Sequence, residues 1–355
     1  MNVTFLIGNG FDINLGLKTR YTDFYDSYIE SNKNRDENDS IKKFCDIIEN
    51  DERYETWADF EAAFAKNAFG AKNDVRDILD DFTVKFSDYL KAQTQLCNYG
   101  DNTTITDQFR FFLADGYKLL EKGDRNVIGA LYETKFKQEL NKIFFINFNY
   151  TNTLDRLVDL LKGRGPLITN LMNTIFKPVI HIHGKLNHNI IIGVDSVKQF
   201  KNEKLKNNQA VEKCCVKRAI NKSVGNLDIE KEFIKIIESS TIVYVYGISF
   251  GKSDQSRWDV ITGWMKNDTS HKLVIYKYGV DYKQYDIAYS AKRLDLIDEY
   301  KDEYLEMLGF EKDEFEQYHD QIFVIDSTDV LKFKLINDEP SKADSSEETK
   351  EAVTV

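Results

Sequence analysis

The chain is short of the residues that usually mark boundaries and cross-links. Its 355 residues include only three prolines and four cysteines. Cys45, Cys97 and the adjacent Cys214 and Cys215 match neither a disulfide framework nor a C-x-x-C metal pair, so we expect reduced thiols. Because prolines are so few, domain boundaries have to be inferred from charge and hydrophobic periodicity.

Long hydrophobic runs and an excess of positive charge are missing as well. No stretch of about 18 apolar residues is present, which predicts no membrane span. No charged leader with an apolar region precedes the first predicted strand, so we expect a cytoplasmic protein. The net charge of −11 argues against a general nucleic-acid surface, because phosphate binding normally needs a basic stripe. The 42% apolar content still suffices for one large domain or two modest ones.

Short apolar runs, each followed by a helical pattern, predict an α/β fold with a mostly parallel, Rossmann-like sheet. The expected strands are residues 3–7, 143–146, 179–183, 190–193, 242–246, 273–276 and 322–325. Residues 25–140 carry aromatic side chains at helical spacing and are interpreted as a large helical insertion after the first strand. The sheet domain would then comprise residues 1–24 and 141–336, and residues 337–355 would form a disordered acidic tail.

Glycines and polar residues gather at the predicted ends of four strands, where open parallel sheets bind ligands. The four segments are Gly8 to Asp12, continuing through Gly16 to Tyr21; Asn147 to Asn152; His181 to Lys185; and Tyr246 to Asp254. In the first, two glycines allow the backbone to approach a ligand closely, and the N–H groups of the following turn favour an anion. The third glycine of a dinucleotide fingerprint is replaced by Ile13, so an ordinary Rossmann oxidoreductase is not supported.

Several of these residues also have a purely structural interpretation. Asn149, Thr151 and Asn152 are suitable N-caps for the helical pattern that follows them. For Asp254 we favour the same capping role. The aromatic stripe in residues 57–64 has helical spacing and is interpreted as core, although Asp59 and Glu61 flank its aromatic positions.

The histidines leave two further alternatives. His181 and His183 alternate along an expected strand and would face the same side, with His181 the better candidate for a structural role. Together with His188, Asp195 or Asp12 they could ligate zinc or manganese. No ligand spacing matches a known signature, so no metal site is expected.

The chain resembles the bacteriophage abortive-infection proteins called AbiH, from residue 1 to about residue 330. The blocks that carry the resemblance are, in order, GNGFDINLGLKTRYTDF, WADFEAAF, FFINFNYTNTLDRL, HIHGKL with IIIGVD after it, and YVYGISFGKSD. AbiH proteins are in turn similar to distant members of the sirtuin-like superfamily, whose Rossmann-type sheet binds NAD. The resemblance therefore implies a defence protein with a sirtuin-like nucleotide site.

This second resemblance implies roles for individual residues. The catalytic pair would be Asn149 and His183, the latter directly before Gly184. The residues that would bind NAD are Gly8, Asn9, Gly10, Phe11, Asp12, Thr19, Tyr150, Gly247 and Ser249. The family's Asp two positions after the Asn is Thr151 here, which leaves the details of ribose recognition open. The zinc module of two C-x-x-C pairs is missing, which argues against protein deacetylation.

The implied activity is cleavage of the nicotinamide–ribose bond of NAD or a related nucleotide. Asn149 would hold a water molecule, and His183 would accept a proton from that water or from a ribose hydroxyl. Two alternatives stay open, a non-catalytic nucleotide sensor and a metal-dependent hydrolase. Such a defence role is compatible with activation by a phage-derived trigger and with assembly into a homo-oligomer.

Overall fold

The computed structural model describes residues 1–50, 59–100, 103–136, 140–163, 173–224, 227–280, 290–328 and 330–336. The predicted disordered tail, residues 337–355, and Trp57 of the aromatic stripe lie outside these residues. Within these ranges, no helix combines the length and the apolar character needed to cross a membrane.

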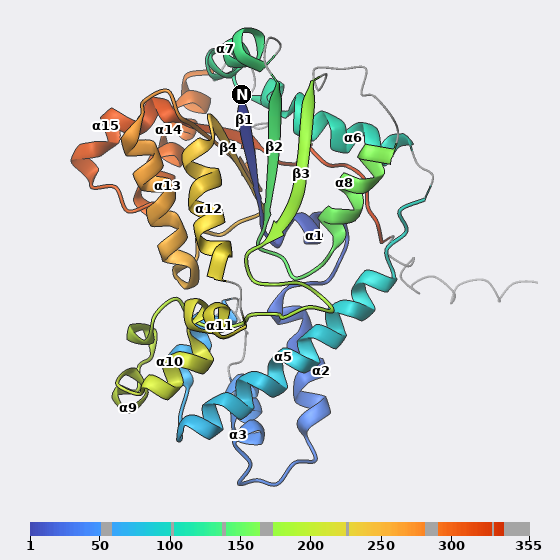
Figure 1. Cartoon of the computed structure of the whole chain (residues 1–355), viewed down its shortest axis with the longest axis vertical. Helices are drawn as coiled ribbons and strands as arrows, with labels where there is room; N and C mark the ends of the chain where they lie inside the picture. Colours follow the sequence, from blue (N-terminus) through green and yellow to red (C-terminus); the bar gives the residue numbers. More distant parts are fainter. Residues whose placement is uncertain are drawn as a thin grey trace, which may run out of the picture.

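A six-stranded sheet forms the centre of the molecule (Figure 1). Its strands are β1 (Asn2–Ile7), β2 (Asn141–Asn147), β3 (Thr174–His181), β4 (Ile242–Tyr246), β5 (Lys272–Lys277) and β6 (Ile322–Asp326). They lie in the order β3-β2-β1-β4-β5-β6, and each of the five neighbouring pairs is parallel. This is the strand order of a doubly wound Rossmann sheet, and it confirms the predicted α/β fold.

The first strand occupies the middle of this sheet because its sequence is apolar on both faces. β1 pairs with β2 on one side and with β4 on the other, and Val3, Phe5, Leu6 and Ile7 are fully buried. Nearly continuous apolar strands of this kind, here broken only by the buried Thr4, are typical of parallel sheets covered by helices on both sides.

One predicted strand is wrong. Residues 190–193 follow β3 along the chain, but they do not join the sheet. The N–H group of Ile191 donates to the carbonyl oxygen of His183, and Val194 forms only an isolated bridge with Val216. Val194 packs among helices rather than strands. A short apolar run indicates burial, but it does not determine which element covers it.

Helices cover both faces of the sheet. On one face the core includes residues from α1 (Gly10–Asn14), α6 (Thr103–Ala114), α7 (Lys122–Leu131) and α8 (Thr153–Gly163). On the other it includes residues from α12 (Leu227–Ser239), α13 (Gln255–Asn267), α14 (Ser290–Met307) and α15 (Phe315–Tyr318). In Figure 1, α12 to α15 lie to the left of the strands and α6 and α8 to the right.

A third group of helices lies beyond the carboxyl ends of the strands (Figure 1). It contains α2 (Tyr21–Asn32), α3 (Ser40–Glu49), α4 (Phe60–Asn67), α5 (Lys72–Gln95), α9 (Glu203–Lys206), α10 (Gln209–Cys215) and α11 (Lys217–Ser223). These elements share a separate core, in which Phe60 stacks on Phe82 and Phe64 packs against Phe44. We call this group the helical layer. The interpretation of the aromatic stripe as core is confirmed for Phe60 and Phe64.

Candidate functional site

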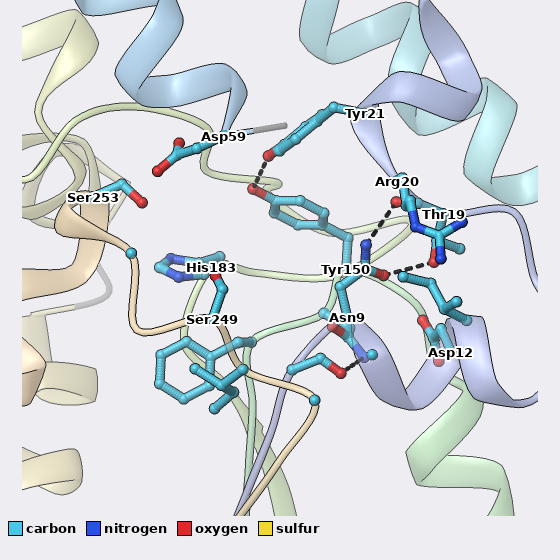
Figure 2. A pocket seen from close by; sticks show the side chains of 18 of the residues that line it. Asn9, Asp12, Thr19, Arg20, Tyr21, Asp59, Tyr150, His183, Ser249 and Ser253 are labelled. Carbon is cyan, nitrogen blue, oxygen red and sulfur yellow. Dashed lines mark hydrogen bonds between the residues drawn. The ribbon is translucent and has the colours of Figure 1, made fainter. Parts of the chain in front are cut away.

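A cavity of about 330 Å³ lies between the carboxyl ends of the strands and the helical layer. The turns after β1, β2 and β4 form one wall, and α2, α4 and α5 contribute residues to the opposite wall. The chain leaves the neighbouring strands β1 and β4 in opposite directions along the sheet, and such a switch point is where open parallel sheets bind ligands. The predicted site residues that line the cavity are Gly8, Asn9, Gly10, Asp12, Thr19, Asn149, Tyr150, His183, Gly247 and Ser249, several of them labelled in Figure 2.

Phe11 is the predicted binding residue that the cavity does not include. Its side chain is fully buried in the core and packs edge-on against Tyr246 and Phe109, with ring centroids 5.9 and 6.5 Å away. Phe11 lies on the first turn of α1, where consecutive side chains point in different directions, so its side chain enters the core and not the cavity.

The glycines of the first turn are required by contact within the protein. A Cβ atom on Gly8 would lie 2.5 Å from the carbonyl oxygen of Gly247, and one on Gly10 would lie 2.6 Å from the Cα atom of Gly247. The N–H groups of Gly8 and Gly10 donate to the carbonyl oxygens of Tyr246 and Gly247 over 2.8 and 2.9 Å. Gly247 has a φ of 68°, which favours glycine. These two N–H groups therefore hold β1 against β4, and they are not available to a phosphate in this arrangement.

A reciprocal pair of hydrogen bonds shapes the loop that follows α1. The side-chain amide of Asn9 donates to the carbonyl oxygen of Thr19 over 3.0 Å, and the Thr19 hydroxyl donates to Asn9 Oδ1 over 2.6 Å. This clasp places Arg20 at the cavity, with its side chain 57% exposed. A solvated guanidinium beside a cavity can attract an anionic ligand.

Asn149 connects the turn after β2 to the turn after β1. Its side-chain amide donates to the carbonyl oxygen of Gly8 over 3.0 Å, and its backbone N–H donates to Asn147 Oδ1 over 3.0 Å. It therefore does not cap α8 with its side chain, which was the structural alternative. The Oδ1 atom of Asn149 receives no hydrogen bond from any residue that the structure describes.

The two histidines that follow β2 in sequence have separate surroundings. His181 ends β3, with Nδ1 3.2 Å from the carbonyl oxygen of Asn149 and Nε2 2.8 Å from Asp155 Oδ2. His183 lies beyond the strand, and its Nε2 is 3.2 Å from Asp254. The expectation that both would face the same side is therefore wrong, because β3 ends at His181 and the chain turns before His183. His181 holds the backbone of Asn149 in place.

His183 is a buried residue that lines the cavity. It is 4% exposed, and its ring contacts Phe148 in a T-shaped arrangement with centroids 5.7 Å apart. Neither ring nitrogen forms a hydrogen bond with a described residue, since the approach to Asp254 lacks the required alignment. Burial lowers the pKa of the imidazole to about 4, despite the opposing charge of Asp254, so the ring is neutral at pH 7.

A buried ionic cluster stands behind His183. The Lys217 ammonium lies 3.0 Å from Glu61 Oε2, 3.2 Å from Asp254 Oδ1 and 3.1 Å from the carbonyl oxygen of Ser253. Arg257 approaches the same Asp254 oxygen at 3.5 Å. Asp254 is at the N-cap position of α13, but its side chain makes no capping hydrogen bond. The favoured capping interpretation is therefore wrong, because two buried cations and His183 occupy this carboxylate instead.

Burial and charge act in opposite directions on the members of this cluster. Burial raises the pKa of Glu61 to about 7, although Lys217 partly offsets the increase. For Asp254, burial would raise the pKa, but Lys217 and His183 hold it below its usual range. Burial would lower the pKa of Lys217, but the two carboxylates hold it above its usual value. At neutral pH, Lys217 and Asp254 are therefore charged and Glu61 is close to its midpoint.

Two tyrosines link the sheet to the helical layer across the cavity. The Tyr150 hydroxyl lies 3.3 Å from the Tyr21 hydroxyl and 3.4 Å from the carbonyl oxygen of Ile191. Figure 2 shows this tyrosine pair beside His183. Burial raises the pKa of both phenols well above its usual value, so both are neutral and can donate hydrogen bonds. Ser249 lies on the loop after β4 and is exposed.

Asp12 occupies another part of the cavity wall. It lies on α1, is 1% exposed, and receives a hydrogen bond of 2.5 Å from the Thr151 hydroxyl at Oδ2. The Thr153 hydroxyl lies 3.2 Å from that of Thr151. No described residue donates to Asp12 Oδ1. Burial raises the pKa of this carboxyl to about 6, against the effect of the threonine hydrogen bonds.

A comparison with known families agrees with the resemblance seen in the sequence. The family model described as bacteriophage abortive infection AbiH matches residues 4–276. The chain belongs to the AbiH family. The matched region of this AbiH chain includes every residue that lines the cavity, and the family assigns it to phage abortive infection. No curated protein matches the chain significantly.

The metal alternative has no geometric support in the described part of this AbiH chain. His181 pairs with Asp155, His183 lies against Asp254, and Asp195 bonds to Ser256. No group of three or more His, Cys, Asp or Glu side chains that could hold a metal ion is found there.

Sequence reasoning missed Lys217, Glu61 and Arg257 as neighbours of the catalytic candidates in the AbiH chain. Glu61 was noticed only as a flanking residue of the aromatic stripe, and Lys217 belongs to a segment with no recognisable motif. These residues come from α4, α11 and α13, and they meet only because the helical layer packs on the strand ends. Lysine and glutamate are usually exposed on helices, so the sequence alone does not indicate when one of them is buried.

Proposed function

We propose that this AbiH chain acts in phage defence by cleaving the nicotinamide–ribose bond of NAD or a closely related nucleotide. The observation that carries the proposal is His183, whose imidazole lines the cavity with Nδ1 buried and without a hydrogen-bond partner among the described residues, while Nε2 faces Asp254 at 3.2 Å. Buried polar atoms without partners are rare in folded proteins, so a ligand or a water molecule would complete this one. The position of the cavity at a sheet switch point supports a nucleotide ligand.

The reaction needs little covalent chemistry from the protein. The bond between nicotinamide and ribose C1′ breaks, and its electron pair leaves with nicotinamide. The oxygen of a water molecule bonds to C1′, and the proton from that water passes to His183. A neutral imidazole can accept this proton, and the Asp254 carboxylate at 3.2 Å stabilises the imidazolium that results.

Asn149 and Arg20 would position the reactants. Because the Asn149 amide is fixed on the Gly8 carbonyl, its Oδ1 has a set direction and could accept a hydrogen bond from the attacking water. Arg20 replaces the Gly8 and Gly10 N–H groups as the candidate for the phosphates, since those N–H groups already have protein partners.

Purified protein incubated with NAD tests the proposal, with nicotinamide release followed by chromatography at several protein concentrations. We expect release by the wild type and a decrease of about 10²- to 10⁴-fold in His183→Ala, the usual range for loss of a general base. His188→Ala is the matched control, because His188 is exposed and outside the cavity. A His183→Ala protein that releases nicotinamide at the wild-type rate would refute the assignment.

The low pKa of His183 favours a second candidate, a nucleotide sensor without turnover. A base with a pKa of about 4 drives proton transfer weakly at neutral pH. In this case NAD would raise the melting temperature of the wild type, no nicotinamide would be released, and the bound nucleotide would signal through the helical layer. Binding without release would therefore favour the sensor.

A further inference from the structure

Asp12 has an unused hydrogen-bonding position. One carboxylate oxygen, Oδ2, accepts the Thr151 hydroxyl, while Oδ1 is buried without a donor in the described part of the chain. A buried carboxylate oxygen without a donor loses its hydration and gains nothing in return. Because Asp12 also lines the cavity, a ligand can supply the missing donor.

The missing donor is not supplied by a cationic side chain. Among the described residues, no lysine, arginine or histidine lies within ion-pair distance of Asp12. The partners that it does have are hydroxyl groups, with Thr151 directly bonded and Thr153 behind it. A carboxylate of this kind suits a neutral hydroxyl donor, and it is too sparsely supported by other carboxylates or histidines to hold a metal ion.

The position of Asp12 in the cavity indicates which hydroxyl group of a nucleotide would donate to its Oδ1 atom. Asp12 follows Asn9, and the Asn9–Thr19 clasp brings Arg20 to the same side of the cavity (Figure 2). In a nucleotide the ribose hydroxyls lie close to the phosphates, so a guanidinium for phosphate and a carboxylate for ribose belong side by side. Carboxylates perform this role for ribose hydroxyls in other dinucleotide-binding sheets.

We propose that Asp12 accepts a hydrogen bond from a ribose hydroxyl of the bound nucleotide and thereby selects ribonucleotides over their deoxy counterparts. This rests on the proposed nucleotide-binding function. Thr151 is a positioning residue, because its hydroxyl fixes one carboxylate oxygen and leaves the other for the ligand. The carboxylate that the sequence lacks at position 151 is thus supplied from α1, which touches that position in space.

Binding measurements test this inference. Isothermal titration of the full chain would compare NAD with a set of NAD analogues that each lack one ribose hydroxyl. We expect one analogue to bind the wild type about 10- to 100-fold more weakly, as a hydrogen bond to a charged group would require. In Asp12→Asn this loss should shrink to below about 10-fold, and in Asp12→Ala it should disappear. His188→Ala should keep the full wild-type preference, because His188 lies outside the cavity.

The outcomes separate this inference from the function on which it rests. The inference fails if the wild type binds NAD and every deoxy analogue equally well. It also fails if the Asp12 variants keep the full difference in affinity between NAD and the deoxy analogues. Either result means that Asp12 does not contact the ribose, and it leaves the proposed function unaffected. If the wild type binds no nucleotide, both proposals fail. Asp12→Asn keeps the shape of the side chain, so this variant remains usable if Asp12→Ala does not fold. Far-ultraviolet circular dichroism would show whether each variant is folded.

Discussion

Removing the charge of Asp12 should change how stability depends on pH. The pKa of this carboxyl rises from 3.8 to about 6 on folding, because burial disfavours its ionised form. The folded state therefore binds the proton more tightly than the unfolded state. Consequently, the free energy of unfolding falls as the pH rises from about 4 to about 6, and it stays reduced above that range.

The size of the effect follows from the two pKa values. At pH 8 both states are ionised, and the buried charge lowers the free energy of unfolding by about 3 kcal/mol. At pH 5 the folded carboxyl is mostly protonated, and the reduction is about 2 kcal/mol. Asp12→Asn has no such titration, so the stability of the variant relative to wild type should rise by about 1 kcal/mol from pH 5 to pH 8.

Urea unfolding of both proteins at pH 5, 6, 7 and 8 measures this difference. Other titrating groups, such as His183 and Glu61, are present in both proteins and largely cancel. Asp159→Asn is the matched control, because the Asp159 side chain is 77% exposed. The stability of this variant relative to wild type should change little with pH. A relative stability of Asp12→Asn that is the same at pH 5 and pH 8 would refute the reasoning about its burial.

Two further substitutions test the packing around the cavity. Lys217→Met should lower the free energy of unfolding by about 3–5 kcal/mol in urea, because it removes the cation between the buried carboxyl groups of Asp254 and Glu61, and adding Glu61→Gln should recover part of the loss. Equal stability of the single and double variants would contradict this pairing. Gly8→Ala should cost about 1–3 kcal/mol, because its Cβ would lie 2.5 Å from the Gly247 carbonyl oxygen. Gly123→Ala, which meets no atom within 4 Å, should stay within about 1 kcal/mol of wild type, and a similar effect of both alanines would refute the contact.

Much of the sheet could be predicted from sequence because the buried parts of its strands are short, nearly continuous apolar runs. Residues 3–7, 242–246 and 322–325 each became strands close to their predicted bounds. Residues 190–193 have the same composition, but they pack into the helical layer. Local pattern cannot distinguish these cases, since both environments are apolar.

The site was predictable where it follows the strand ends and was not where it depends on tertiary contact. Asn149 and His183 were found because they follow apolar runs, and both line the cavity. The glycine pair was also found, but its cause is the approach of Gly247, which is distant in sequence. Lys217 escaped notice because its partners come from other helices.

The wall of the cavity has a consequence for the time at which the protein can act. Its residues extend from Gly8 to Trp258, and the Gly8 turn rests on Gly247 of the loop after β4. During synthesis, β1 can pair with β2 first, but its second neighbour, β4, begins only at Ile242, more than two hundred residues after β1 ends. Nascent copies on the ribosome, and fragments cut short before α13, lack a complete cavity. The cavity of such a defence protein therefore has all of its lining residues only once the chain has been made as far as Trp258.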